Sequence, residues 1–372
     1  MRAMPEARAD FDGEALVAEA MEALRSVGDR RSALNASAVS SAVRVQAGLA
    51  IPCTDSELEA ASPADFGLSG DSPEVLAALS APRVLLRIPA GGSAGMSIGP
   101  WDGAPSSLAR GPGAAALGLC VLVDAEEGSS LDAALSFACG VSSELPSGLV
   151  VGVRAGRNSR IRLSSRAVCV SGGSGWGLVA GRLSEGALAG ECSLIDSSGF
   201  FRLSSRFELL SESSRLSSCG LSLPHPGGMA ERFFSVSRVA RSFVGVAQRH
   251  LHLGGGESSF SVEGLFPEDA DEASFVSLEE AAMTTGSPSS SSANGVPAIP
   301  LDERMVLDLR FLGIPESSAR RLAARSFAAS LFDGLREDAA FAPLSGLKRF
   351  PVEDAVVRLV SAMDAALSAQ AF

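Results

Sequence analysis

The segment from residue 160 to residue 210, RIRLSSRAVCVSGGSGWGLVAGRLSEGALAGECSLIDSSGFFRLSSRFELL, contains several short runs in which apolar and polar residues alternate. Such alternation is typical of β-strands with one buried face, and we find no good helical pattern in this segment. Residues 172–175, Gly-Gly-Ser-Gly, resemble the turn of a hairpin. We therefore interpret the segment as an antiparallel meander, with strands at 167–170, 178–183, 192–195, 200–203 and 207–210.

The tripeptide Arg-Leu-Ser occurs three times in this segment, beginning at residues 162, 182 and 202. A constant spacing of this kind can mark a solenoid in which each repeat contributes a pair of strands. Arginine and serine are abundant in this part of the chain, so we attribute the three matches to chance rather than to a solenoid.

Residues 83–153, which precede the meander, predict a βαβ unit. Apolar runs at 84–88, 117–123 and 148–153 are bounded by glycine and proline and predict buried strands. Between the last two runs, residues 131–139 have apolar residues at helical spacing and predict a helix.

Helices are predicted on both sides of this sheet region. At the N-terminal side the patterns predict helices over 11–28 and 32–47 and a short helix over 72–79. At the C-terminal side they predict a helix from Asp302 to Leu312, a second from Ser317 to Phe332 and a third that begins near Pro351.

Together these patterns predict an α+β fold with a mixed, largely antiparallel sheet core, N-terminal helices and a separate C-terminal helical module. We divide the chain into an N-terminal helical segment with a loop (1–80), a mixed α/β sheet domain (81–262), an acidic and Ser-rich linker (263–298) and a helical module (299–372).

Charge is unevenly distributed along the 372 residues, whose net charge is −12. Residues 151–250 carry 13 Arg and 6 acidic residues, whereas residues 251–300 carry 8 acidic residues and no basic one. A basic region attracts anionic partners, and the acidic segment 263–280 could itself fold back on it. The arginine run has no interleaved aromatic residues, so a protein or internal partner is favoured over nucleic acid. The candidate anion- or partner-binding residues are Arg154, Arg157, Arg160, Arg162 and Arg166.

The last predicted helix offers a second surface for a protein partner, because its apolar residues form a single stripe. The residues of this stripe are Val352, Val356, Leu359, Val360, Met363 and Leu367.

Residues 91–95, Gly-Gly-Ser-Ala-Gly, match the G-x-S-x-G motif of serine hydrolases, with Ser93 as the nucleophile. Acids and histidines follow in the required chain order, at Asp124 or Asp196 and at His225 or His250. Residues 89–90 separate the motif from the preceding strand, and Gly99-Pro100 interrupts any helix after it. We therefore predict that the protein is not an enzyme, with a serine hydrolase as an alternative.

His250 and His252 would point to the same face of a strand, as two metal ligands can do. No further ligand stands at a diagnostic spacing, so we predict no metal site and no cofactor.

The six cysteines are widely spaced, which predicts buried, reduced thiols rather than disulfides or a zinc site. The chain has no secretory signal and no apolar stretch long enough to span a membrane, so we expect a cytoplasmic or nuclear protein.

The segment from Leu117 to Leu210 resembles the FIST family of sensory, small-ligand-binding domains. The resemblance rests on a strand to Asp124, a helix over 131–139, Val150-Val151-Gly152 and the turn into 175–179. At residues 196–199 this chain has Asp-Ser-Ser-Gly where the family has a Gln-Gly-Cys-like corner. The resemblance implies a small-ligand sensory domain.

A shorter stretch, from Pro297 to Glu316, is similar to the C-terminal helix of the Ada-type transcriptional adaptor subunits of histone acetyltransferase complexes. This similarity implies contacts with other proteins of an assembly.

From the sequence we therefore expect a non-catalytic protein-interaction or scaffold subunit of a larger assembly, with protein partners and an Arg-rich sheet region for an anionic partner. A FIST-like small-ligand sensor and a serine hydrolase that uses Ser93 are the alternatives, and the oligomeric state is left open.

Overall fold

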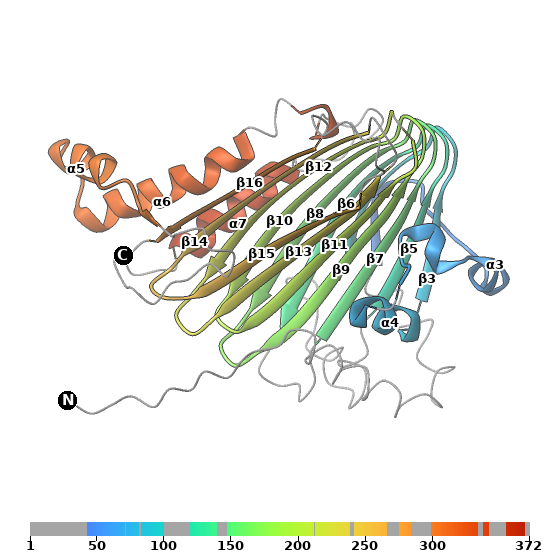
Figure 1. Ribbon diagram of the computed structural model, residues 1–372, viewed down its shortest axis with the longest axis horizontal. Helices are drawn as coiled ribbons and strands as arrows, with labels where there is room; N and C mark the ends of the chain where they lie inside the picture. The colour runs from blue at the N-terminus through green and yellow to red at the C-terminus, as the bar shows by residue number, and fades with distance from the viewer. Residues whose placement is uncertain are drawn as a thin grey trace.

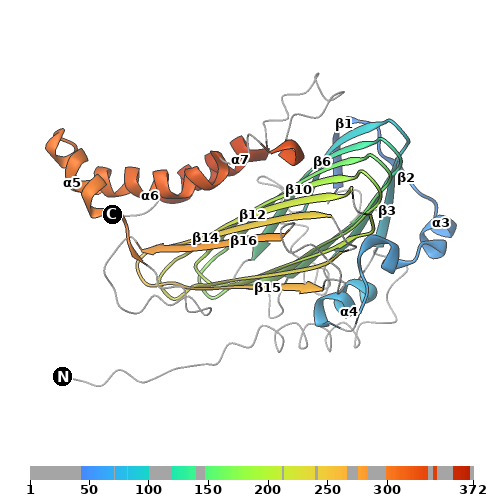
Figure 2. The same ribbon diagram turned by 45° about the horizontal axis from the view of Figure 1, so that its top comes forward.

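Strands from most of the described chain form two sheets that lie face to face (Figure 1, Figure 2). Sheet A contains, in spatial order, β1 (Val43–Gly48), β4 (Ser93–Ile98), β6 (Ser130–Cys139), β8 (Arg160–Cys169), β10 (Leu188–Ser197), β12 (Arg215–Pro224), β14 (Phe243–His252), β16 (Phe275–Met283) and β17 (Ile299–Pro300). Sheet B contains β2 (Ile51–Pro52), β3 (Arg83–Ile88), β5 (Leu119–Ala125), β7 (Ser147–Ala155), β9 (Ser174–Leu183), β11 (Phe200–Leu209), β13 (Met229–Arg238) and β15 (Glu257–Leu265). The computed structural model describes residues 43–70, 72–81, 83–99, 119–139, 147–211, 213–238, 242–265, 275–283, 299–333, 338–341 and 355–368.

From β4 to β16 the strands alternate between the two sheets, so the chain winds as a parallel β-solenoid of about five turns. Leu131, Ile161 and Ala189 occupy the same position in successive turns, so one turn takes 30 residues and the next takes 28. Antiparallel pairing among the described strands is found at the N-terminal end, where β1 pairs with β4 and β2 with β3.

The main core lies between the sheets, because alternate side chains of each strand point inward. In β6 the inward side chains belong to the same buried cluster as those of the facing strands of sheet B. These inward residues are Leu131, Ala133, Leu135, Phe137 and Cys139.

Helices form further layers outside both sheets. On sheet A, α6 (Glu316–Asp333) and α7 (Ala355–Ser368) bury an apolar surface that includes Cys192, Leu194 and Leu221 (Figure 2). On sheet B, η2 (Pro63–Phe66) and α4 (Pro73–Ser80) cover the strands nearest the N-terminal end, and α3 (Asp55–Ala60) lies beside them. Parallel strands covered on both faces lose the clear alternation of a half-exposed sheet.

The predicted α+β fold with a largely antiparallel sheet is therefore wrong. Residues 131–139 form strand β6 rather than a helix. The prediction failed because the alanines of this segment fit a helical and an alternating pattern equally well. The turn at 172–175 is not a hairpin, since it joins β8 to β9 in the opposite sheet. β5 and β7 are parallel neighbours, as in a βαβ unit, but a strand of the other sheet connects them.

The Arg-Leu-Ser tripeptides do not mark the solenoid repeat, although the chain is a solenoid. Arg162 and Arg202 are the third residues of β8 and β11, whereas Arg182 is the ninth residue of β9. Each tripeptide places its leucine in the interior core, so its arginine lies on the outer face of its sheet, where Arg162 is covered. The recurrence therefore reflects strand alternation, and the turn is longer than the 20-residue spacing.

Several predicted elements are confirmed, including the short helix near 72–79 and the three strands over 84–153. Of the predicted helix 32–47, residues 43–47 instead form β1, which extends the sheet into the predicted N-terminal helical segment. The predicted helix 11–28 lies outside the described residues. The predicted linker 263–298 contributes the end of β15 and the whole of β16.

A charged and polar cluster lies inside the C-terminal half of the solenoid. The guanidinium of Arg232 lies 3.1 Å from Oε2 of Glu191 and donates a 2.8 Å hydrogen bond to Oε1 of Gln248, and neither Arg232 nor Glu191 is exposed. The hydroxyls of Ser205 and Ser218 donate to the same carboxylate. Paired in this way, the buried charges are tolerated, whereas either one alone would be costly.

Gly220 provides the space that this guanidinium occupies. A Cβ at Gly220 would lie 1.9 Å from a terminal nitrogen of Arg232 and 2.1 Å from Oε1 of Gln248. Arg232 belongs to sheet B and Gly220 to sheet A, so the arginine side chain spans the interior.

Candidate functional site

The most exposed apolar side chains of the described chain lie on and after α5 (Glu303–Phe311), which extends beyond the solenoid (Figure 1). Phe311 is 87% exposed and Leu312 is 79% exposed, and Leu307 lies one helical turn before Phe311. Val306 on the opposite face is buried against Ala319 and Ala323 of α6. One face of α5 thus anchors the helix and the other presents apolar atoms to solvent, which is unusual for a solvated surface.

Polar contacts fix the position of α5. The carboxylate of Asp302 caps the helix by accepting hydrogen bonds from the backbone N–H groups of Arg304 and Met305, as the predicted start of this helix requires. The guanidinium of Arg320 in α6 lies 2.9 Å from the Glu303 carboxylate. The apolar face of α5 is therefore held in one orientation.

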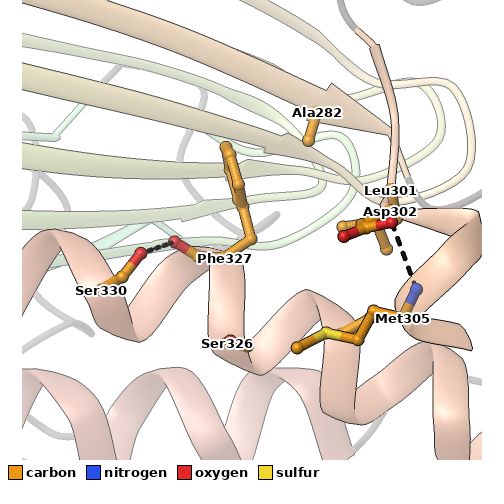
Figure 3. A pocket seen from close by; sticks show the side chains of 8 residues that line it. Ala282, Leu301, Asp302, Met305, Ser326, Phe327 and Ser330 are labelled. Atoms are coloured by element: carbon orange, nitrogen blue, oxygen red, sulfur yellow. Dashed lines mark hydrogen bonds between the residues drawn. The ribbon is translucent and has the colours of Figure 1, made fainter. Parts of the chain in front are cut away.

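An apolar pocket of about 490 Å³ lies where α5 and α6 meet the C-terminal end of sheet A (Figure 3). Its lining residues are Ala282, Leu301, Asp302, Met305, Ala323, Ser326, Phe327 and Ser330. Met305 lies seven residues before Leu312 and thus on the same side of the helix. It connects the pocket to the exposed apolar residues, and we call the surface formed by Met305, Leu307, Phe311 and Leu312 the α5 surface.

The arginines predicted to bind an anionic partner are spread over several elements, and three of them form ion pairs with acids of neighbouring turns. Arg154 donates to the carboxylate of Asp124 through two nitrogens. Arg157 lies 3.0 Å from Glu185.

The other three arginines of the predicted group lie in β8. The buried Arg162 lies 3.1 Å from Asp132 and donates to the backbone oxygen of Phe341. Arg166 is partly buried, and Arg160 is exposed at the start of the strand.

The acidic segment 263–280 contacts other residues than these arginines, where the structure describes it. Glu280 forms an ion pair with Arg249, and Glu279 lies 3.3 Å from Nε2 of His250. Both carboxylates belong to β16, which pairs with β14. Residues 266–274 lie outside the described residues.

The apolar stripe predicted as a partner-binding helix face packs within the chain where its side chains are described. Met363 and Leu367 are buried on sheet A, and Val360 packs against the same cluster. Val352 lies outside the described residues, and Val356 and Leu359 lie in α7 without a described side chain.

The structure does not bring Ser93 together with His225 or His250, the histidines proposed as its bases. His250 is in register with Ser222 and thus with Ile195, near the far end of their strands. Ser93 stacks in register with Ser130, Arg160 and Leu188 at the start of their strands. Asp196, whose carboxylate contacts Nε2 of His225, lies eight residues beyond Leu188, about 26 Å further along the strand.

His250 and His252 do point to the same side, as predicted, but that side is the interior of the solenoid. Their ring centroids are 6.4 Å apart and both side chains are buried. Nδ1 of His252 contacts the backbone oxygen of Gly256, and its Nε2 contacts the hydroxyl of Ser258. Within the described part of the chain, no three His, Cys, Asp or Glu side chains converge to hold a metal ion.

We expect the two histidines to make stability depend on pH. Burial lowers the pKa of His250, partly offset by Glu279, while the positive charge of Arg232 lowers it further. Burial also lowers the pKa of His252. Below a pH of about 6.5 a histidine of the unfolded chain binds a proton, whereas the same histidine in the folded protein, with its lowered pKa, stays largely neutral. Acid therefore favours the unfolded state, and the free energy of unfolding falls as the pH drops.

Urea unfolding measured between about pH 7.5 and 5.5 tests this expectation. His250→Leu should give a smaller loss of stability over this interval than the wild-type protein. If the free energy of unfolding depends on pH as steeply in the variant as in the wild type, His250 is as protonated in the folded state as in the unfolded state.

No known protein family matches the chain, and no curated protein is significantly similar to it. The resemblances to the FIST family and to the Ada-type adaptors are thus not accompanied by a match to a known family or to a curated protein. The predicted absence of a membrane-spanning helix is confirmed for the described residues, in which no helix is long and apolar enough.

Proposed function

We propose that the protein is a non-catalytic binding subunit that uses the α5 surface to hold a protein partner. The exposure of Phe311 and Leu312 on a helix fixed by its opposite face carries this proposal. Exposed apolar residues next to an apolar pocket are typical of protein interaction sites.

The chemistry of the surface indicates what such a partner presents. A large aromatic side chain with aliphatic neighbours is a frequent centre of binding energy, and charged residues around it exclude water. Arg304, Asp308 and Arg310 are exposed on the same helix. We therefore expect an apolar segment of the partner to cover Phe311 and Leu312 and to insert a side chain into the pocket beside Met305.

The other candidate surfaces offer weaker support for a partner. Arg154 and Arg162 are already paired with acids of this chain, and Met363 and Leu367 are covered by sheet A. An anionic partner would have to compete with Asp124 and Asp132 for these arginines.

Affinity purification of the full-length protein with quantitative mass spectrometry tests the proposal. Phe311→Asp/Leu312→Asp places charges in the centre of the α5 surface and should remove the partner, since losing one such centre costs about 2 kcal/mol or more, roughly a 30-fold weaker complex. Because the contact is apolar, the partner should stay bound to the wild-type protein in high salt.

Arg321→Asp is the matched control, because Arg321 is an exposed residue of α6 outside the α5 surface. It should retain the partner. If both variants recover the same proteins as the wild-type chain, the α5 surface is not the binding site; if the protein lost is a second copy of this chain, the partner is the protein itself.

A further inference from the structure

Two pairs of cysteines face each other across neighbouring parallel strands. Cys139 at the end of β6 is the register partner of Cys169 at the end of β8. Cys192 in β10 is likewise the register partner of Cys219 in β12. None of the four forms a disulfide in the structure.

The spacing of parallel strands suits a disulfide between such partners. In-register residues lie about 4.8 Å apart, within the Cα range of about 4.4–6.8 Å that disulfides adopt. The usual strand spacing of about 4.8 Å exceeds the Cβ–Cβ range of about 3.5–4.5 Å found in disulfides, so the two strands must approach locally for the bond to form. Strained disulfides of this kind are the more easily reduced ones.

The surroundings of the two pairs differ. Cys169 lies at the turn between the sheets, and its Sγ lies 3.3 Å from the backbone oxygens of both Gly173 and Phe200. Hydrogen bonds from Cys139, and then from Ser197 and the backbone, lower the pKa of Cys169 although burial opposes them. A lower thiol pKa means more of the reactive thiolate at neutral pH.

Cys192 and Cys219 instead lie in the middle of their strands, beneath the helical layer on sheet A. Burial raises the pKa of Cys192 well above its usual value, and Cys219 raises it further. This pair has the same register relation, but the raised pKa of Cys192 disfavours its thiolate, so the pair serves as an internal comparison.

We propose that Cys139 and Cys169 form a redox-active pair, which hydrogen peroxide converts into a disulfide joining two consecutive turns of the solenoid. The Cys169 thiolate attacks one oxygen of the peroxide and breaks the O–O bond, which leaves Cys169 as a sulfenic acid and releases hydroxide that is protonated to water. The Cys139 sulfur then attacks the Cys169 sulfur. The S–S bond forms, the sulfenic hydroxyl leaves as water with the Cys139 proton, and two electrons have passed to the peroxide.

The test is peptide mapping of the folded, full-length protein after treatment with peroxide. Trypsin cleaves at the arginines between Cys139 and Cys169, so a disulfide links two separate peptides whose joint mass is lower by two hydrogens. We expect this link to form, to disappear on treatment with a dithiol and to be absent in Cys139→Ser. That variant also assigns the bond, because Cys120 lies on the same tryptic peptide as Cys139.

The sulfenic acid step has its own readout. In Cys139→Ser, which lacks the resolving thiol, dimedone should label Cys169 after peroxide treatment, whereas the wild-type protein should show little label. If Cys139→Ser does not fold, fragmentation of the linked peptide from the wild-type protein still decides whether the bond involves Cys139 or Cys120.

Two results would overturn the proposal. One is peroxide treatment that leaves Cys139 and Cys169 unlinked. The other is a link between Cys192 and Cys219 that forms as fast as the first, since oxidation would then follow general unfolding of the solenoid.

Discussion

Replacing Arg232 by Met should lower the free energy of unfolding by about 3–5 kcal/mol, because it leaves the carboxylate of Glu191 buried without its positive partner. Neither side chain is exposed, and the pair lies at 3.1 Å between the two sheets. Gln248 would also lose the guanidinium that donates to its side-chain oxygen. Urea unfolding measures the change.

A second substitution separates the charge effect from the loss of packing. Adding Glu191→Gln to Arg232→Met removes the unpaired charge but keeps an acceptor for the hydroxyls of Ser205 and Ser218. We expect the double variant to be more stable than Arg232→Met alone, a non-additive effect that is typical of residues in one ion-pair network.

The matched control is an arginine whose ion pair lies at the surface. Arg157 lies 3.0 Å from Glu185, and both side chains are 59% exposed. Arg157→Met should change the free energy of unfolding by no more than about 1 kcal/mol. Equal losses at positions 157 and 232 would contradict the buried position of Arg232.

Replacing Phe332 by Ala should cost a similar amount, about 3–5 kcal/mol, because it opens a cavity between α6 and sheet A. Phe332 is fully buried in the cluster that α6 and α7 form with Leu194 and Leu221. Since this cluster attaches the helices to the solenoid, the loss should appear as increased hydrogen exchange in α6 before the strands exchange.

Phe311 provides the comparison for Phe332 within the same helical module. Phe311→Ala removes the same ring from a largely exposed position and should leave stability within about 0.5 kcal/mol of wild type. If Phe311→Ala destabilises the protein as much as Phe332→Ala does, the ring at position 311 is buried and the α5 surface does not exist as described.

Several helices and strands could be predicted because their signals are local. Asp302 caps α5 through its own side chain, and a glycine with φ of +83° at Gly313 follows the end of the helix, as the sequence indicates. Val84 to Ile88 form a strand in an apolar run bounded by proline. Each of these features depends on residues only a few positions apart.

The solenoid itself could not be predicted from repetition, because stacked positions do not repeat their residues. Ala133, Leu163, Glu191 and Ser218 occupy one interior position in four successive turns. The turn length also varies, so neither a motif nor a fixed spacing reveals it. The outer layers of helices then hide the alternation within each strand.

The candidate sites depend on how neighbouring strands align with one another, which the sequence does not reveal. That Cys139 faces Cys169 follows only from the pairing of β6 with β8, which no short-range pattern indicates. The apolar residues of α5 were visible in the sequence, but only the packing of Val306 on α6 determines which of them stay exposed. The stripe of α7 was recognised as apolar, yet its described residues meet sheet A.

Photo-crosslinking from the α5 surface tests the proposed function most directly. A photoreactive amino acid in place of Phe311, in the full-length protein inside its own cells, should give a crosslink to a protein partner on illumination. The same amino acid in place of the exposed Arg321 of α6 should not. Substituting Leu307 by Asp in the same chain should remove the crosslink from position 311. Equal crosslinking from the two positions, or none from position 311, would contradict a binding role for this surface.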